Sequence, residues 1–446
     1  MSLLTVAGGA IRAVHLARPP SVFDEGFYAP DACWYVHRSA HLCGQAAEVT
    51  KEHPPLAKWL IGFGIELLGY HSRGWRIAPL VAGTITIPLL YLLARRLTGS
   101  TVAATVTAGL LAVDFLHFLQ SRLAMLDVFV TLFGVAAVLF AVIDRDRLTA
   151  GAVRRARIAR PWRLAAGMAG GAAVACKWSG LGVLAAVVVL AVVWEVAAAR
   201  DSRRPLSDQA LPMAGTLLLA PLVVYAASYA NLLHGSLLAA PWSNGSWWWA
   251  FVHRQHEMLS EQSGLAGSQP YESPTWSWPL VQRPVLYFFQ QTGGRYREIL
   301  AIGDPLVWWP SVAAIGYAVV RFVRSRDVWG PEIVVTAAVA CTYLPWFIVV
   351  LQRQQVFLFY LLPTVPFMCL ALGVVAGRLW QVTAGRVAVV ALAVLAVAAF
   401  AYMYPVLTAN PLTPGQWRDR VILRQCPQRL PQLSQHARPP SGWCWV

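Results

Sequence analysis

The chain of 446 residues is 57% hydrophobic and only 13% charged, with a mean hydropathy of +0.52. Soluble domains carry roughly 25% charged residues, so this composition excludes a soluble protein and indicates an integral membrane protein. A net charge of +15 would suggest nucleic-acid binding in a soluble chain. In a membrane protein, basic residues collect in cytoplasmic loops, and we expect no nucleic-acid partner.

Apolar runs recur along the chain. About 20 helical residues cross a hydrocarbon core of roughly 30 Å. We therefore predict an all-α polytopic membrane protein with about eleven transmembrane helices by this spanning-length rule. The predicted helices lie near residues 3–18, 76–94, 101–120, 123–143, 164–176, 178–199, 210–230, 305–323, 331–350, 355–377 and 387–404. The first and the fifth are short, and the short first helix suggests that the natural start lies upstream.

Arginines in the short loops indicate the orientation. They cluster around residues 95–96, 145–163, 200–204, 321–326 and 378–386. All these loops fall on one face if the N-terminus is cytoplasmic, because cytoplasmic loops are enriched in basic residues. The C-terminus is then external.

The external face receives the larger connecting pieces. We divide the chain into a transmembrane catalytic domain, residues 1–404, with external loops 19–75 and 231–304, and an external C-terminal tail, residues 405–446. Within the first loop, residues 54–70 are typical of a helix that lies in the membrane interface.

Two cysteine pairs lie in regions assigned to the external face. Cys33 and Cys43 share the first loop, and Cys426 and Cys444 share the tail. An oxidising compartment would allow two local disulfides. The Cys and His spacings do not suggest a zinc site, and we expect no metal and no cofactor.

Adjacent acids follow the first apolar run, at Asp24 and Glu25. Acids beside a lipid boundary are energetically costly, so we expect them to have a function. A positioned carboxylate can deprotonate a hydroxyl acceptor. Neighbouring side chains in an extended segment point to opposite sides, so we expect the two acids to have different roles. The alternative is that they only solvate the end of the first helix.

Basic residues at helix ends complement these acids. Arg122 lies between two apolar runs and is the best candidate to hold a departing phosphate, because the guanidinium binds phosphate in forked geometry. Lys177 and Arg353 occupy similar turns. The alternative for all three is interfacial snorkelling. Asp114, His117 and Asp127 flank Arg122, and we expect local pairing that orients this arginine.

Five local strings resemble the protein O-mannosyltransferases. They are Val22-Phe23-Asp24-Glu25, His53-Pro54-Pro55-Leu56-Ala57-Lys58, Gln120-Ser121-Arg122-Leu123-Ala124-Met125-Leu126-Asp127, Cys176-Lys177-Trp178-Ser179-Gly180, and Pro270-Tyr271-Glu272-Ser273-Pro274 with Trp276-Ser277-Trp278-Pro279. Their order and spacing match across most of residues 12–365. Each string alone is weak, and five in register are specific.

The resemblance implies a GT-C glycosyltransferase fold and inverting transfer of mannose from polyprenyl-phosphate-mannose to Ser or Thr hydroxyls. The acceptors would be polypeptides crossing the membrane, such as chains emerging from the secretion translocon. By resemblance, Asp24 is the base and Glu25 a substrate or acceptor contact, with Arg122 at the donor phosphate. Arg12 also matches a basic position of the family. We also place His53, Lys58, Lys177 and Arg353 among the substrate-binding candidates.

The chain departs from the family pattern in places. Ala57 stands where members usually have Gly, and Lys51 stands where an acid is common. The loop 231–304 is too short for the carbohydrate-binding-like domain of eukaryotic members. The short loop favours a bacterial, actinobacterial-type member. Together with the predicted orientation, this implies a protein of the plasma membrane, surrounded by membrane lipids, with its site on the extracytoplasmic side.

Two other functions stay open at this level. One is a GT-C transferase that moves another lipid-linked sugar, such as arabinose, aminoarabinose or a hexose, to lipid or cell-wall glycan. The other is a lipid or ion transporter. Transporters place ionisable groups near the bilayer midplane and often show internal repeats. In this sequence the middles of the apolar runs are nearly free of charge, and no internal repeat is visible.

Overall fold

The computed structural model describes residues 1–149, 160–202, 205, 207–230, 247–264, 271–352 and 355–420. Its N-terminal half contains α1 (Ser2–Ala13), α2 (Glu25–His37), α3 (Ala40–Cys43), α4 (Leu56–Leu68), α5 (Ser72–Thr98), α6 (Thr101–Val113), α7 (Phe115–Gln120), α8 (Asp127–Thr149), α9 (Pro161–Cys176) and α10 (Gly180–Ser202). It continues with α11 (Ser207–Ala214), the π-helix η2 (Gly215–Leu219), α12 (Ala220–Ala227), α13 (Trp247–Gly264), the 3₁₀-helix η4 (Thr275–Leu280), β1 (Val285–Thr292) and β2 (Arg295–Ala301). The last elements are α14 (Pro305–Ser325), α15 (Pro331–Tyr343), α16 (Trp346–Gln352), the 3₁₀-helix η5 (Leu358–Thr364), α17 (Val365–Leu379), α18 (Thr383–Leu407) and α19 (Pro414–Arg418).

The fold is a bundle of apolar helices, as the composition predicts. Among the described residues, eight helical stretches are long and apolar enough to cross a membrane. They correspond to α5, α8, α10, α11 to α12, α14, α15 to α16, η5 to α17, and α18. The other three expected spans correspond to α1, α6 and α9, with 12, 13 and 16 residues. At 1.5 Å per residue these are shorter than a full crossing, and eleven crossings remains a prediction.

The helix expected at residues 101–120 is broken at Asp114. The backbone of Asp114 is extended, and its carboxylate accepts the backbone N–H of His117 at 2.8 Å. Asp114 is thus the N-cap of a new helix, and the chain continues as the short α7. The break brings the Ser121-Arg122 turn close to the helices of the N-terminal segment.

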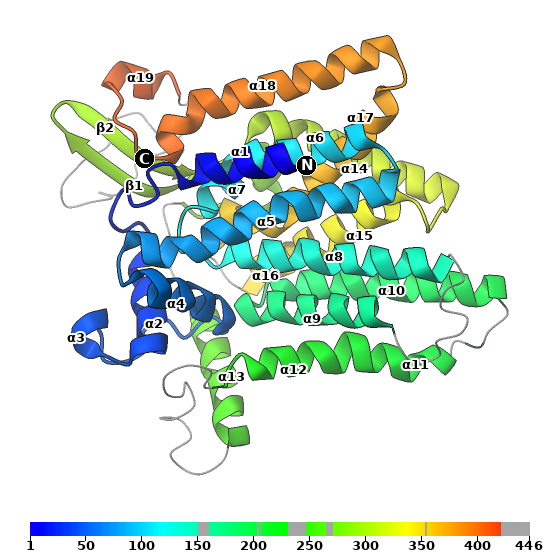
Figure 1. Ribbon diagram of the computed structural model, residues 1–446, viewed down its shortest axis with the longest axis horizontal. Coiled ribbons are helices and arrows are strands. Elements are labelled where there is room, and N and C mark those ends of the chain that lie inside the picture. Colours follow the sequence, from blue (N-terminus) through cyan, green and yellow to red (C-terminus); the bar gives the residue numbers. More distant parts are fainter. Residues whose placement is uncertain are drawn as a thin grey trace.

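The two ends of the bundle differ in character (Figure 1). One end carries α2, α3, α4, the β-hairpin and α19. At the other end, Arg160 bonds both Asp144 and Glu195, and Arg163 bonds Glu195 at 3.0 Å. These ion pairs tie together the neighbouring ends of α8, α9 and α10. Arg160 and Arg163 therefore lie at the end opposite the first loop, as do Arg95 and Arg96 in the last turn of α5.

A β-hairpin interrupts the helical pattern, and the all-α prediction did not include it. Strands β1 and β2 pair antiparallel, with Thr292 opposite Arg295. Gly293 and Gly294 form the turn with φ of 57° and 70°, a conformation that glycine adopts without strain. Two glycines between runs rich in aromatic and β-branched residues are a hairpin signal that a search for apolar spans overlooks.

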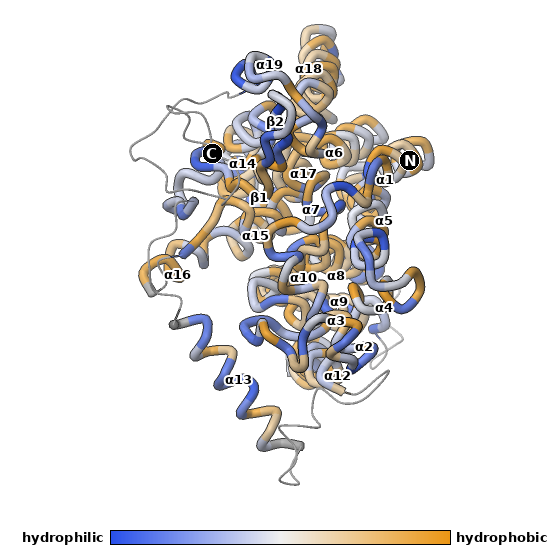
Figure 2. Tube along the Cα trace, turned by 90° about the vertical axis from the view of Figure 1, so that its left-hand side faces the viewer, coloured by the Kyte–Doolittle hydropathy of each residue, from blue (hydrophilic) through white to orange (hydrophobic). Residues whose placement is uncertain are grey.

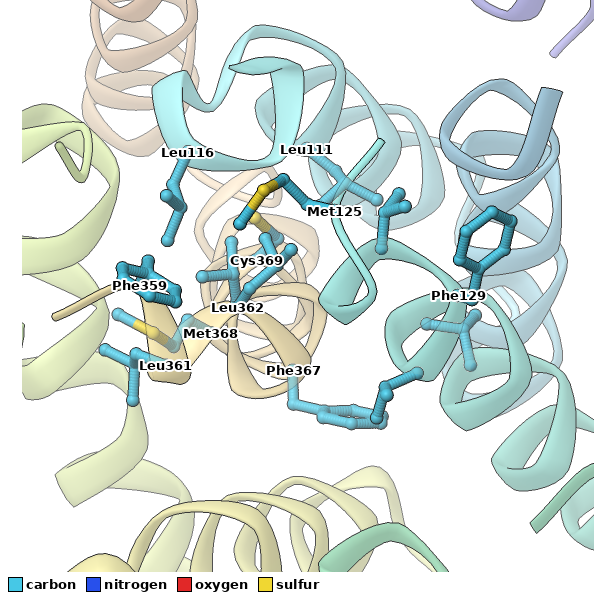
Figure 3. Close-up of a cluster of buried hydrophobic side chains, with 14 of the residues drawn as sticks. Leu111, Leu116, Met125, Phe129, Phe359, Leu361, Leu362, Phe367, Met368 and Cys369 are labelled. Atoms are coloured by element: carbon cyan, nitrogen blue, oxygen red, sulfur yellow. The ribbon is translucent and has the colours of Figure 1, made fainter. Parts of the chain in front are cut away.

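The interior is packed with apolar side chains from distant segments. Figure 3 shows Phe359, Leu361 and Leu362 of η5 with Met368 and Cys369 of α17, gathered near Leu116 and Met125. Figure 2 shows the apolar stretches along the bundle helices, whereas α13 alternates between hydrophilic and apolar segments. Because η5 lies in the core, it holds its aromatic residues rigidly beside the candidate site.

Candidate active site

Asp24 occupies a strained turn at the start of α2. The preceding residue, Phe23, has φ of 47°, which is rare for a bulky side chain and costs on the order of 1–3 kcal/mol. Asp24 is the N-cap of α2 but makes no side-chain capping bond. Its half-buried carboxylate accepts one long hydrogen bond, from the Tyr28 hydroxyl at 3.4 Å. One carboxylate oxygen thus has no protein donor within the described residues.

The surroundings of Asp24 favour its protonated form. Burial is the largest cause and raises the pKa of this carboxyl to about 7, with smaller contributions from Asp127 and Glu52. The ammonium of Lys177 and the Tyr28 hydroxyl act in the opposite direction. A carboxylate whose pKa lies near neutral pH is a more effective general base than an ordinary aspartate.

Glu25 has a different environment from its neighbour. Its side chain is 1% exposed and receives Arg76 in a forked pair, with Nε to Oε1 at 2.7 Å. The backbone N–H of Ala124 donates to the same Oε1 at 2.8 Å. Glu25 therefore joins the start of α2 to α5 and to the turn that follows Arg122. This geometry anchors the start of α2, and a substrate or acceptor contact by Glu25 stays a prediction.

Arg122 and Arg12 lie at helix ends in the interior. Arg122, 4% exposed, donates from Nη1 to the carbonyl of Ile11 at 3.2 Å and to that of Arg12, so it caps the end of α1. Arg12 is fully buried and bonds the carbonyls of Gly8 and Ala112. Neither arginine forms an ion pair with an acid in the described part of the chain. Nε and Nη2 of Arg122 make no described hydrogen bond, which leaves this edge of the guanidinium available.

Lys177 lies in the tight turn between α9 and α10. Its ammonium is 3.0 and 2.9 Å from the two oxygens of Asp127 and 4.5 Å from the centre of the Tyr360 ring. The turn requires glycine at position 180, because an added Cβ would lie 2.3 Å from the backbone of Ala173. The ammonium is therefore held in a fixed place close enough to Asp24 to influence its pKa.

The expected pairing around Arg122 is wrong. Asp127 pairs with Lys177, and the His117 ring bonds Arg12 at 3.1 Å. Asp114 bonds the indole N–H of Trp308 at 2.8 Å. The three residues are near Arg122 in sequence, but helix geometry directs their side chains to different partners.

The two candidate residues of the His-Pro-Pro element, Lys58 and His53, have different surroundings. Lys58 is fully buried, and its ammonium bonds Asp31 at 2.9 Å, Glu48 at 2.9 Å and the carbonyl of Thr50. These acceptors engage all three protons, so Lys58 anchors the first loop, and its role in substrate binding stays a prediction. The ring of His53 lies 6.1 Å from that of Tyr28, whose hydroxyl donates to Asp24.

Several other expectations can be located. Cys33 and Cys43 form the predicted disulfide, with Cα atoms 5.6 Å apart. Cys426, Cys444 and Arg353 lie outside the described residues. Within the described residues, no group of three His, Cys, Asp or Glu side chains could hold a metal ion.

Sequence reasoning did not select Arg76, Tyr28 or Tyr360. Arg76 gave a usable signal, since it is the one charged residue in the predicted span 76–94. A charge in such a segment is costly and predicts a buried partner. Tyr28 and Tyr360 gave no such signal, because aromatic residues are common throughout this chain.

Comparison with known proteins places these features in context. A family model described as dolichyl-phosphate-mannose-protein mannosyltransferase matches residues 71–235, and one for the C-terminal four TMM region of protein-O-mannosyltransferase matches residues 247–426. The polyprenol-phosphate-mannose–protein mannosyltransferase of Mycolicibacterium smegmatis is 30% identical, covering 95% of this chain and 91% of that protein. The protein of the same name from Mycobacterium tuberculosis is also 30% identical, over 90% and 86%.

The fold resembles a solved structure as well. The S. cerevisiae protein O-mannosyltransferase Pmt1–Pmt2 complex bound to the sugar donor superimposes with a TM-score of 0.76. The match covers 95% of this chain and 91% of the yeast chain at 16% identity. At this identity the superposition establishes a shared fold.

Proposed function

Since the chain belongs to the dolichyl-phosphate-mannose-protein mannosyltransferase family, we propose that it transfers mannose from a polyprenyl-phosphate-mannose to Ser or Thr hydroxyls of proteins. The reaction would take place at the extracytoplasmic face of the plasma membrane, on polypeptides such as those emerging from the secretion translocon. The larger loops and the β-hairpin would form this face, and the arginine-rich end would face the cytoplasm.

The carboxylate of Asp24, with one oxygen that has no donor among the described residues, is the observation that carries the proposal. Both oxygens of Glu25 are engaged by Arg76 and Ala124, whereas the side chain of Asp24 makes a single long hydrogen bond within the described parts of the chain. Asp24 would take the proton of the acceptor hydroxyl as that oxygen bonds to the anomeric carbon of mannose. The bond from this carbon to the phosphate oxygen breaks, and the polyprenyl phosphate leaves with the electron pair. Attack opposite the leaving group inverts the configuration.

Arg122 and Lys177 would stabilise the departing phosphate. Arg122 has one edge of its guanidinium available, and its Nη1 is already held by the end of α1. Lys177 is held by Asp127 and by the face of Tyr360. Donors fixed before the reaction stabilise the developing charge without reorganising, which makes such groups effective in catalysis.

The test is a transfer assay with purified full-length protein in lipid nanodiscs. Radiolabelled polyprenyl-phosphate-mannose is incubated with a Ser/Thr-rich peptide and, separately, with the same peptide carrying Ala at every Ser and Thr. We expect label in the first peptide and none in the second. Label in lipid or glycan instead would favour the alternative glycosyltransferase. Donor movement across the bilayer without label transfer would favour a transporter.

A further inference from the structure

Tyr287 joins three separate parts of the candidate site. It lies in strand β1, more than 160 residues along the chain from Phe23 and from Gln120, the residues that its side chain contacts in the other two parts. The strand has an irregular register at this point, because Leu286 pairs with Leu300 and Phe288 pairs with Ile299. Tyr287 is therefore the bulged residue, without a partner in β2. Bulges of this kind redirect a side chain and are frequent beside active sites.

The ring of Tyr287 packs on the residue before the proposed base. Its centroid lies 4.2 Å from that of Phe23, with the planes only 8° apart. Phe359 closes the stack edge-on to both, at 6.0 Å from Phe23 and 5.7 Å from Tyr287. Phe23 is the residue with φ of 47°. A backbone in this conformation persists only when its surroundings enforce it, and the stack provides that enforcement.

The hydroxyl of Tyr287 contacts the arginine side of the site. The amide of Gln120 donates to this oxygen at 2.8 Å, and both side chains are buried. Gln120 is the last residue of α7 and is followed by Ser121 and Arg122. One side chain of the hairpin thus touches the turn that carries Asp24 through its ring and the turn that carries Arg122 through its hydroxyl.

We propose that Tyr287 is a positioning residue that holds the Phe23-Asp24 turn in register with the Arg122 turn. This inference rests on the proposed function, in which Asp24 is the base. The hairpin then has a catalytic purpose, because it fixes the distance between the group that takes the proton and the group that holds the phosphate. Displacements of about 1 Å at such sites can lower rates by roughly 10²-fold.

Several titratable groups face Asp24 from the surrounding elements. Lys177 comes from the turn between α9 and α10, Asp127 from the start of α8, and Glu52 from the first loop. Tyr28 faces it from α2. Tyr287 also lies close enough to Asp24 for the two groups to interact electrostatically. Removal of the Tyr287 ring would admit water to the carboxylate and leave these charges in place. Hydration favours the ionised form and lowers the pKa of Asp24.

The test compares Tyr287→Leu and Tyr287→Phe with the wild-type protein across pH 5.5–8.5 in the transfer assay. For Tyr287→Leu, kcat should fall roughly 10- to 100-fold. Its donor KM should also rise about tenfold, because this variant loses the same Gln120 hydrogen bond, while its acceptor KM should change about threefold or less. The acid limb of its kcat/KM profile, where activity falls as the pH decreases, should move to lower pH by about 0.5 pH unit or more, because Asp24 is better hydrated. Tyr287→Phe keeps the stack, so its acid limb should stay in place. Loss of the Gln120 hydrogen bond should raise its donor KM by about tenfold, equivalent to roughly one hydrogen bond.

The matched control is Phe289→Leu, which removes an aromatic ring from the same strand. Phe289 packs against Tyr296 and Trp417 and not against Phe23. The Phe289→Leu variant should retain the wild-type kcat and the wild-type acid limb of the kcat/KM profile. An equal change in Phe289→Leu would assign the effect to general loosening of the hairpin and overturn the inference. Wild-type kcat and an unmoved acid limb in folded Tyr287→Leu would also overturn it.

A second variant covers the case in which Tyr287→Leu does not fold. Phe23→Gly removes the other ring of the stack, and glycine tolerates the positive φ. It should show the same loss of kcat and the same shift of the acid limb, and wild-type behaviour would contradict the inference. Asp24→Asn separates the two hypotheses. An active Asp24→Asn refutes the base assignment, whereas an inactive one with unaffected Tyr287 variants refutes only the positioning role.

Discussion

At the scale of single residues, two adjacent acids have opposite environments. Glu25 is completely enclosed by Arg76 and the backbone of Ala124, whereas Asp24 keeps a carboxylate oxygen that has no donor among the described residues. Burial without a full set of donors raises the pKa of Asp24 to about 7. The difference follows from one step in helix register, because Asp24 caps α2 and Glu25 is its first residue.

The substitution Asp24→Asn should abolish transfer by at least about 10²-fold, since it removes the base. The fold should be retained, because the Asp24 side chain makes one long hydrogen bond, to Tyr28, in the part of the chain that the structure describes. Thermal unfolding of the purified variant checks the fold, and Glu66→Gln serves as the control, because Glu66 belongs to the same loop and its side chain is 39% exposed. Transfer near the wild-type rate would refute the role of Asp24.

The pH dependence has a definite sign. A base must be ionised to accept a proton, so activity depends on the deprotonated fraction of Asp24. With a pKa near 7, kcat/KM of the wild-type protein should fall tenfold per pH unit well below pH 7. An acid limb near pH 4, typical of an exposed aspartate, would contradict the environment that the structure gives this residue.

The substitution Glu25→Gln should reduce stability instead of acting on chemistry alone. It leaves the Arg76 charge buried without its carboxylate, and breaking such a buried pair costs about 3–5 kcal/mol. Chemical unfolding of the purified variant measures this loss. Unchanged stability with loss of acceptor binding would restore the substrate contact that the sequence suggested for Glu25.

At the scale of elements, most helices follow from apolar runs, and the exceptions have local causes. Asp114 stops a helix because its side chain caps the next one. The hairpin forms because Gly293 and Gly294 allow a tight turn between strand-forming runs. The first loop is ordered by polar contacts, in which Asp31 and Glu48 surround Lys58 and hold it in a fully buried position.

The Cys33–Cys43 disulfide should stabilise this loop. It closes a segment of 10 residues, and closure of a loop of this size contributes about 2–3 kcal/mol. Replacement of both cysteines by Ala should lower the unfolding temperature, and a reductant should lower that of the wild-type protein but not of the variant. Free thiols at both positions in peptides digested without reduction would refute the bond.

At the scale of the whole molecule, the two ends of the bundle are chemically distinct. Helix α2, which Asp24 caps, and the hairpin lie at one end, and ion pairs such as Arg160 with Asp144 and Glu195 join helix ends at the other. The arginine-rich end is expected to face the cytoplasm. The site therefore would open toward the side where secreted polypeptides appear.

The orientation can be tested with single cysteines in intact cells. Gln291→Cys lies near the hairpin turn and Ser325→Cys at the end of α14, and both positions are exposed. A membrane-impermeant maleimide should label Gln291→Cys directly and Ser325→Cys only after permeabilisation. The reverse labelling would invert the proposed orientation.

The sequence alone determined the membrane class, the approximate helices, the disulfide in the first loop and the residues Asp24, Arg122 and Lys177 as candidates. These depend on local composition, spacing and short strings, which a chain displays directly. Only the tertiary structure decided the partners, because pairs such as Glu25 with Arg76 and Lys177 with Asp127 are about fifty residues apart and have many competitors. The same holds for Tyr287, whose contact with Phe23 spans most of the chain. The same tertiary contacts distinguish Glu25, which Arg76 and Ala124 anchor, from Asp24, which accepts one long hydrogen bond within the described residues.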